Sequence, residues 1–452
     1  MKISKNIYLA AMAAAVAGAA GLSSCSDTLE IQPLEYKEDP NFAPPHIQAA
    51  WNLEEISSDM VGDGAYAYKD KLYNGLFTRT LGWNGGDGVQ TTLLPDGNLW
   101  WTFNDSFYGV VNGEDRSRKS CSFPRNTVMV QTKDETGRLG ETDEHLRWLA
   151  SFVQTTDPNK DRYYQARTHL RHPKGELSEA DIERGDIDQK WLYWAGDGTI
   201  VNGKLQQLWN GVNTPGNGDM IQHNTALAIY SLDGKYGDEG YLKMESVDHD
   251  FIPENTYGYG STLWEDEDGH TYLYSATGNG QWLGNVPIVA RSTTHDLQST
   301  WEYYVPNDEG EMIWQTEYPL DVQAKSSGIA PDQGSITLPW VFKKGDWYYM
   351  TAQTFPFGHE LVIMRAEHPW GPFKDKKVLL KFPNPLDELQ LGEYNNLYML
   401  HLHQGLARED ELVISTNTDP KDFWDSFNAP GSADWYRPFF YRIFKWERVF
   451  EH

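Results

Sequence analysis

Short apolar runs separated by glycine, proline and aspartate recur along the 452-residue chain, a pattern typical of strands and turns rather than helices. The clearest example is the stretch 82–108, GWNGGDGVQTTLLPDGNLWWTFNDSFY. It predicts a hairpin whose strands, Val89–Leu94 and Leu99–Phe103, are joined by the turn Pro95–Gly97. A three-residue turn centred on Asp96 pairs residues whose numbers add to 192, whereas a two-residue turn shifts the sum to 193.

The open end of this hairpin carries an aspartate on each arm, Asp87 before the first strand and Asp105 after the second. In the 192 register the two residues lie opposite each other on one face, with Cβ atoms about 4.5–5.5 Å apart. In the 193 register their side chains point to opposite faces. Because retaining glycosidases hold their two carboxyl groups about 5–5.5 Å apart, the hairpin is a candidate catalytic site whose register is decisive.

The beginning of the hairpin recurs along the chain, which indicates a repeat architecture. The similar segments are Gly86–Thr91, Gly196–Val201, Gly258–Leu263 and Asp332–Thr337, at spacings of 110, 62 and 74 residues. A fifth unit is expected from Tyr398–His403 and Leu412–Ser415. Strand-rich units with a period near 80 over about 400 residues predict an all-β, five-bladed β-propeller. The long first spacing predicts an insertion between blades one and two over Lys133–Gln189, with a short helix at Leu177–Arg184.

The residue before the second glycine of each repeat differs from unit to unit: Asp87, Asp197, Tyr259 and Gln333. Because the innermost strands of a propeller line a central funnel, these residues are expected to form a ring of catalytic and substrate-binding groups. Glycine beside each of them lets the backbone pass close to a neighbour or a ligand. The alternative is that each glycine opens a strand and the residue beside it is solvated.

The first 25 residues have the features of a lipoprotein signal peptide, with Lys2 and Lys5, an apolar core and a lipobox ending at Cys25. Cys25 is expected to be lipidated; an ordinary secretory signal is the alternative. Residues 26–50 are proline-rich and predict a tether, and 51–452 form a single propeller domain. The protein is thus expected as a monomer at the outer membrane or cell surface, in contact with the membrane only through its lipid.

Charge and composition limit the classes of ligand that the protein is expected to bind. The net charge of −27 argues against nucleic acid and favours a neutral or cationic ligand. Aromatic residues make up 13% of the chain and suit sugar rings, although large β folds are often rich in them. With Cys25 lipidated, Cys121 is the only free cysteine of the mature chain, so no intrachain disulfide can form, and Cys121 is expected to pack as a small apolar residue.

The motif of the first blade runs Asp87-Gly88, Leu94-x-Asp96-Gly97 and Trp101-x-Phe103-x-Asp105, and is followed by Arg125-Asn126-Thr127 and, near the end, Tyr436-Arg437-Pro438. It resembles a bacterial propeller group long known only as domains of unknown function, which includes endo-D-arabinanases, and the wider set of five-bladed furanosidase propellers. The resemblance covers roughly residues 75–446. It implies a five-bladed propeller and a retaining mechanism with Asp105 as nucleophile and Asp87 as general acid/base. This chain has Asn104 where the group often has glycine.

The site is therefore expected to cleave a furanose-containing, arabinan-like glycan. Two close carboxylates resist double ionisation, so one should stay protonated near neutral pH. Asp105 is expected to be the ionised partner, held by Asn104, Arg125 or Asn126, while Trp83 stacks under a sugar ring. A surface glycan-binding lipoprotein without catalysis and a partner-binding scaffold are the alternatives.

No cofactor is expected, since the chain has no phosphate loop, dinucleotide fingerprint or Gly-x-Ser-x-Gly elbow. His401 and His403 alternate on one predicted strand and so face the same way. One of them could lie near the propeller axis, where related propellers sometimes hold an ion or water. A structural role is the simpler interpretation of both.

Overall fold

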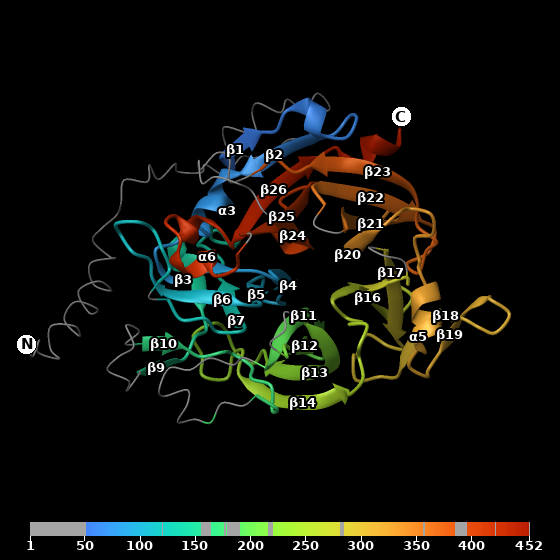
Figure 1. Cartoon of the computed structure of the whole chain (residues 1–452), viewed down its shortest axis with the longest axis horizontal. Coiled ribbons are helices and arrows are strands. Elements are labelled where there is room, and N and C mark those ends of the chain that lie inside the picture. The colour runs from blue at the N-terminus through green and yellow to red at the C-terminus, as the bar shows by residue number, and fades with distance from the viewer. Residues whose placement is uncertain are drawn as a thin grey trace, which may run out of the picture. The chain divides into compact units, whose positions relative to one another are not determined.

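The computed structural model describes residues 51–451, apart from 120, 155–163, 176–177, 179–189, 216–219, 281–283, 356–357, 385–395 and 421. From Leu53 onward the described strands form five antiparallel sheets of four or five strands and two short ribbons. The sheets follow one another around a common centre (Figure 1). The predicted all-β, five-bladed β-propeller is confirmed. The predicted signal peptide, Cys25 and the tether lie outside the described residues.

Blades one and two each have four strands, and the repeated glycine motif lies at the start of the first strand in blade one and within the first strand in blade two. Blade one contains β4 (Gln90–Leu93), β5 (Leu99–Phe103), β7 (Thr127–Gln131) and β8 (Leu146–Trp148). Blade two contains β11 (Trp191–Val201), β12 (Lys204–Asn213), β13 (Ile221–Ser231) and β14 (Met244–Ile252). In β11 the motif itself makes a bulge, since the register with β12 shifts between Ala195 and Gly198.

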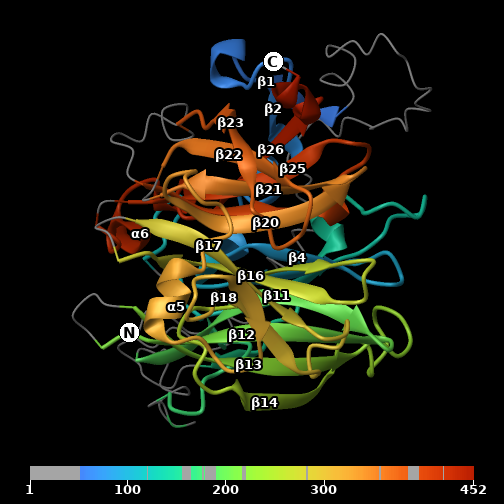
Figure 2. The same cartoon turned by 90° about the vertical axis from the view of Figure 1, so that its right-hand side faces the viewer.

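Blades three and four follow in the same way (Figure 2). Blade three contains β15 (Thr262–Glu265), β16 (Thr271–Gly278), β17 (Asn285–Ser292), β18 (Trp301–Pro306) and β19 (Met312–Gln315). Blade four contains β20 (Ile336–Lys344), β21 (Trp347–Thr354), β22 (Glu360–Ala366) and β23 (Lys374–Lys381).

Blade five joins the two ends of the domain and thereby closes the ring of sheets. Its strands, in order, are β24 (Asn396–Leu402), β25 (Leu412–Asp419), β26 (Pro438–Phe444), β2 (Tyr66–Asp70) and β1 (Leu53–Glu55). A buried arginine on β26, Arg442, binds Asp70 at the end of β2 and Glu411 just before β25, both at 2.6 Å. This ion-pair cluster ties the amino-terminal strand to the carboxy-terminal ones.

Shorter elements connect the blades. Two ribbons lie outside the five sheets: β3 (Leu81–Gly86) with β6 (Ser106–Val110), and β9 (Phe152–Gln154) with β10 (Tyr164–Ala166). The helices are α3 (Lys71–Leu76), α5 (Asp321–Ser326) and α6 (Asp425–Asn428), with 3₁₀ turns η1 (Ser58–Met60), η2 (Asp143–His145), η3 (Gln404–Leu406), η4 (Ser432–Asp434) and η5 (Trp446–Phe450). Among the described residues no helix has the length and apolarity to cross a membrane.

The insertion expected between blades one and two stays a prediction. Part of the range 133–189 belongs to blade one itself, because β8 is its fourth strand. The ribbon of β9 and β10 also falls in this range. Of the helix expected at Leu177–Arg184, all residues but Ser178 lie outside the described part of the chain.

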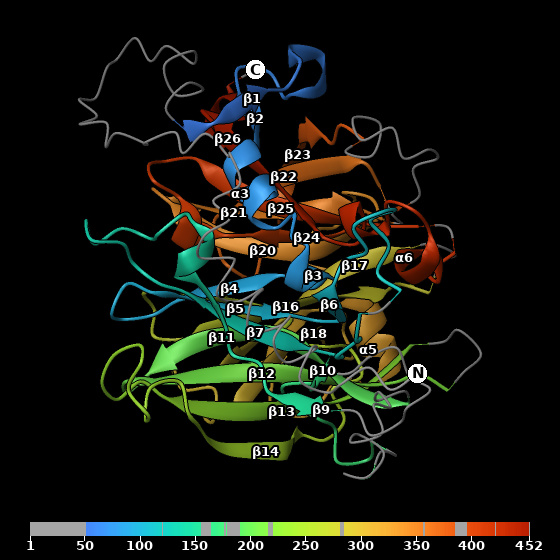
Figure 3. The same ribbon diagram turned by 90° about the vertical axis from the view of Figure 1, so that its left-hand side faces the viewer.

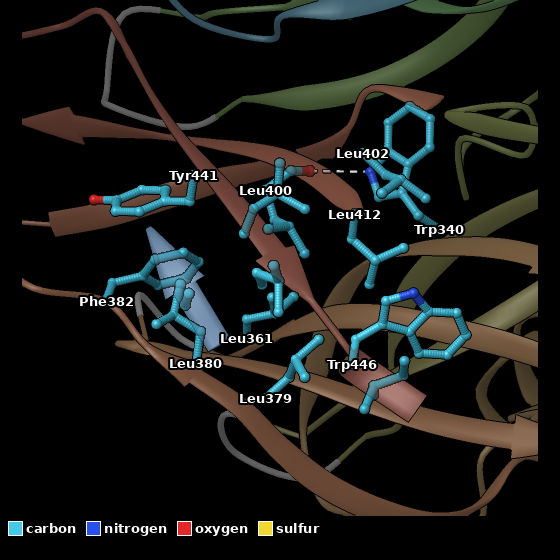
Figure 4. Packing of buried hydrophobic residues seen from close by; sticks show 14 of the residues in the cluster. Trp340, Leu361, Leu379, Leu380, Phe382, Leu400, Leu402, Leu412, Tyr441 and Trp446 are labelled. Atoms are coloured by element: carbon cyan, nitrogen blue, oxygen red, sulfur yellow. Dashed lines mark hydrogen bonds between the residues drawn. The ribbon is translucent and has the colours of Figure 1, made fainter. Parts of the chain in front are cut away.

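Apolar side chains fill the space between neighbouring blades. The largest described cluster joins blades four and five, where Trp340, Leu361, Leu400 and Tyr441 pack together (Figure 4). The indole nitrogen of Trp340 donates to the carbonyl oxygen of Leu400 at 3.0 Å, so the polar edge of the ring is satisfied inside the core. Burial of large aromatic side chains of this kind holds adjacent blades at fixed positions.

Candidate active site

The first hairpin has the register that allows its two aspartates to act together. Gln90 pairs with Thr102 between the aspartates and the turn, and Gly86 pairs with Ser106 just beyond the aspartates. The residue numbers of both pairs add to 192. The turn is the three-residue form, and Gly97 adopts the left-handed backbone, φ +82°, that this turn requires. Of the two registers that the sequence left open, the hairpin therefore has the 192 register.

The aspartates sit where the ribbon of β3 and β6 meets blade one. The backbone nitrogen of Asp87 donates to the carbonyl oxygen of Asp105 at 3.3 Å, and that of Asn104 donates to the carbonyl oxygen of Asp87 at 2.8 Å. Asn104 and Asp105 thus face one residue, as in a β-bulge. Gly88 has φ +57°, and a Cβ there would lie 2.0 Å from Nδ2 of Asn104, so glycine is required beside Asp87.

Asp87 is buried and bound by two tyrosines from blade five. The hydroxyls of Tyr398 and Tyr436 donate to its Oδ2 at 2.8 and 2.9 Å, while no described residue forms a hydrogen bond with its Oδ1. Burial, and then the negative charge of Asp105, raises the pKa of Asp87 to about 8, against the opposing effect of the tyrosine hydrogen bonds. Asp87 is therefore protonated at neutral pH.

Asp105 is buried too, but it faces a cation. Arg125 binds it with two hydrogen bonds, Nε to Oδ1 at 2.7 Å and Nη2 to Oδ2 at 3.0 Å, and the indole nitrogen of Trp194 donates to Oδ1 at 3.3 Å. Burial raises the pKa of Asp105, and Arg125 opposes that rise. Because the guanidinium lies against Asp105, the shared charge of the pair resides there and the proton resides on Asp87.

The position of Tyr436 is fixed by a buried arginine. Tyr436 has a left-handed backbone, φ +49°, and its carbonyl oxygen accepts a hydrogen bond from the nitrogen of Gly86 at 2.8 Å. Arg118, fully buried, donates to the carbonyl oxygens of Trp435 and Asn84 at 2.7 and 2.8 Å. Helix α6 lies beside β6 (Figure 3). The ring of Phe107 on β6 packs against that of Phe427 on α6, with centroids 4.7 Å apart.

Asn104, Arg125 and Asn126 are the residues expected to hold Asp105. Arg125 does so, and the two asparagines do not. The amide oxygen of Asn104 accepts the backbone nitrogen of Ala195 at 2.7 Å and joins blade one to blade two. The amide nitrogen of Asn126 donates to the carbonyl oxygens of Leu170 and Tyr193. Both asparagines hold the surrounding backbone in place, and this corrects the expectation that they bind Asp105.

Trp83 does not offer a surface for a sugar ring, contrary to expectation. It is completely buried and stacks on Trp148 of β8, with centroids 4.8 Å apart and an interplanar angle of 11°. Its indole nitrogen donates to Ser106. Trp194 is a better candidate, since the residue is partly exposed and its indole nitrogen binds Asp105.

The expected ring of Asp87, Asp197, Tyr259 and Gln333 is not formed as predicted. Asp197 is buried, and its two oxygens accept the backbone nitrogens of Gly198 and Leu263, which links blades two and three; burial raises its pKa to about 7. Tyr259 is fully buried in an apolar cluster against Tyr303. Gln333 contacts Lys376 of β23, the strand of blade four farthest from β20.

His401 on β24 and His403, directly after β24, lie in the interior. His403 interacts through its ring nitrogens with Thr91 at 3.1 Å and Ser415 at 2.8 Å, and burial lowers its pKa well below its usual value. His401 has no hydrogen-bond partner for either ring nitrogen among the described residues. Among the residues that the structure describes, no group of three or more histidine, cysteine, aspartate or glutamate side chains could hold a metal ion. Cys121 packs as expected, buried with Phe107 and Phe123.

Sequence reasoning missed Trp194, Tyr398 and the role of Tyr436. Tyr436 belongs to a motif already noted, Tyr436-Arg437-Pro438, and Tyr398 begins the expected fifth unit. Only the closure of the ring brings these tyrosines, more than 300 positions away along the chain, to Asp87. No local signal marks Trp194.

Comparison with known proteins agrees with this architecture. Residues 70–446 match the model of the family described as Domain of unknown function (DUF5005). A crystal structure of a Bacteroides ovatus protein provisionally named a hydrolase is 51% identical, with a TM-score of 0.82, and the match covers 92% of this chain and 99% of that one. The Cellvibrio cellulosa α-L-arabinanase complexed with arabinohexaose is 14% identical, with a TM-score of 0.38 and coverage of 80% and 90%. The GH43_1 enzyme from Xanthomonas citri is also 14% identical, with a TM-score of 0.39 and coverage of 81% and 88%. Matches this distant carry no argument about function. No curated protein matches the sequence.

Proposed function

The chain belongs to the DUF5005 family, and we propose that it is a retaining glycoside hydrolase that cleaves furanose-containing, arabinan-like glycans with Asp87 and Asp105. The observation that carries the proposal is the contrast between two opposed aspartates, one bound by tyrosines and protonated, the other bound by Arg125 and ionised. Environments that separate the proton affinities of two carboxyl groups are how acid and nucleophile are assigned in glycosidases. The provisional name of the Bacteroides ovatus relative supports a hydrolase.

In the first step, the carboxylate of Asp105 attacks the anomeric carbon while Asp87 gives its proton to the departing glycosidic oxygen. The product is a glycosyl ester on Asp105 and a free alcohol. In the second step, the now ionised Asp87 takes a proton from water, which displaces Asp105 from the anomeric carbon. Two displacements restore the original anomeric configuration, and both aspartates return to their starting states.

Arg125 and the tyrosines have separate tasks in this scheme. Arg125 orients Asp105 and keeps it ionised before attack, and it remains as a cationic partner when the carboxylate leaves the sugar. Tyr398 and Tyr436 bind Oδ2 of Asp87, so the proton of the acid resides on Oδ1, which is buried and has no partner among the described residues. Trp194 is partly exposed beside Asp105 and is the aromatic side chain that would contact the sugar at the site of cleavage. The amino-terminal sequence supports action at the cell surface by a lipid-anchored protein.

The test is incubation of the purified protein with a panel of arabinans and galactans, with product length read by chromatography and anomeric configuration by ¹H NMR at early times. Turnover with retention is expected, and Asp87→Asn and Asp105→Asn should each reduce it by at least about a thousandfold. Asp346→Asn, in an exposed turn of blade four, is the control and should turn over normally. Unchanged rates in both active-site variants would refute the assignment. Glycan binding without any product, unaffected by either substitution, would favour a binding protein.

A further inference from the structure

A third carboxyl group, that of Asp419, lies on the side of blade five that faces Asp87. Asp419 is the last residue of β25 and pairs with Asn396 of β24, two positions from the pair of Asn417 and Tyr398. Opposed and alternate residues of a sheet share a face, so Asp419 shares the face of Tyr398, whose hydroxyl binds Asp87. On the same face, Asn417 donates to the carbonyl oxygen of Gly86, next to Asp87, at 2.7 Å.

One carboxylate oxygen of Asp419 has no partner among the described residues. Its Oδ1 is buried, and no described residue forms a hydrogen bond with it. Burial raises the pKa of Asp419 to about 6, so the group is charged at neutral pH despite this lack of partners. A buried carboxylate oxygen without a donor lowers the stability of the fold, and such groups are typical of functional sites.

The charge of Asp419 acts on the acid of the site. The groups that face Asp87 are Asp105 from blade one, and Tyr398, Tyr436 and Asp419 from blade five. Asp419 makes ionisation harder for Asp87 and for both tyrosines. Arg125, the cation of the site, is bound to Asp105.

We propose that Asp419 is a positioning residue for the catalytic acid, whose negative charge keeps the proton on Asp87 through neutral pH. It acts through Asp87 and takes no part in bond making. The role of Asp419 in catalysis rests on the proposed function, but the pKa of Asp87 can be measured without any substrate. Because Asp419 is only partly exposed and its Oδ1 is buried, its charge should weaken the fold, which is the opposite of what a structural residue would do.

The experiment titrates Asp87 itself. The full chain is labelled with [4-¹³C]aspartate, the Asp87 carboxyl signal is identified by its absence in Asp87→Asn, and its shift is followed from pH 5 to 10. In Asp419→Asn the pKa of Asp87 should fall by about half a unit to one unit, as expected for loss of a neighbouring charge. Asp419→Ser, which also removes the charge, should give the same fall. Asp425→Asn, in the exposed first turn of α6, is the matched control and should leave the pKa unchanged.

The melting temperature of Asp419→Asn supplies the second readout and should equal or exceed that of the wild type. A pKa of Asp87 that is the same in both Asp419 variants and in the wild type would overturn the inference. So would a fall in melting temperature without a change in that pKa, since it would show a structural role. If the pKa falls as expected while no glycan is cleaved, the proposed function fails and the inference about Asp419 stands.

Discussion

The replacement of Asp87 by asparagine should make the protein more stable above neutral pH, and the gain should grow with pH in a defined way. The side chain is buried, and its pKa is raised to about 8 from an ordinary value of 3.8. Asparagine has nearly the same shape but cannot ionise. The variant therefore removes one titration from the folded state and leaves the packing around the two tyrosines in place.

The size and sign of the effect follow from proton linkage. Between the ordinary pKa and the raised one, the folded protein keeps the proton of Asp87 while the unfolded chain has lost it, so stability falls as pH rises. The slope for one proton is about 1.4 kcal/mol per pH unit. Over the window from about pH 4 to about pH 8, the wild type should thus lose on the order of 5 kcal/mol relative to Asp87→Asn.

The assay is urea unfolding of both proteins from pH 5 to 9, with the difference in free energy of unfolding plotted against pH. The difference should rise steadily up to about pH 8 and then level off. Titrations of groups that do not interact with Asp87 cancel because both proteins share them, and Asp346→Asn should track the wild type throughout. A difference that does not change between pH 5 and 9 would show that Asp87 ionises like a solvated aspartate. The acid role would then have no basis.

Three further substitutions test the surroundings of the site and the closure of the ring. Tyr436→Phe removes a donor that favours the ionised form of Asp87, so the pKa of Asp87 should rise and the alkaline limb of the kcat/KM profile should move to higher pH. Gly88→Ala places a Cβ against Asn104 in a left-handed backbone and should lower the free energy of unfolding by about 2–4 kcal/mol in urea titrations. Arg442→Met leaves two buried carboxylates unpaired and should cost about 3–5 kcal/mol in the same measurement.

Matched controls separate these effects from the general cost of substitution. Gly137 has φ +84° but nothing within 4 Å of its Cβ position, so Gly137→Ala should cost only about 1 kcal/mol. Lys325 forms an exposed ion pair with Asp321 and is the control for Arg442. Lys325→Met should lower the free energy of unfolding by less than about 1 kcal/mol. Equal losses for each variant and its control would contradict the assigned contacts. An alkaline limb that moves to lower pH in Tyr436→Phe would contradict the role of that hydroxyl.

Features encoded by neighbouring residues could be predicted from the sequence. The hairpin strands were expected at Val89–Leu94 and Leu99–Phe103 and occur at Gln90–Leu93 and Leu99–Phe103. Proline, aspartate and glycine at the turn determine its length, and the length determines the register of everything beyond it. Repeated glycine motifs revealed the fold because they recur at the first strand of four of the five blades.

Features that depend on distant residues could not be predicted in this way. A motif gives the position of a residue along a strand but not which neighbouring blade covers it. Trp83 looked available for a sugar, yet Trp148, 65 positions later, covers its face. Tyr259 lies at a glycine motif but turns into the core between blades. Gln333 lies in a similar motif, but Lys376 binds the carbonyl oxygen of this residue on the side of blade four farthest from β20.

The site lies between blade one and blade five, at the seam where the ring of blades closes. Its assembly therefore depends on that closure. Asp105 receives its partners, Arg125 and Trp194, from blades one and two. Asp87 receives Tyr398 and Tyr436 from blade five, which is complete only after the two ends of the domain have paired. Loosening of that seam exposes Asp87 to water, so the burial that raises its pKa is lost, while Asp105 keeps its cation. The acid is therefore the more fragile half of the site, and any loss of closure should abolish protonation of the leaving group before it disturbs the nucleophile.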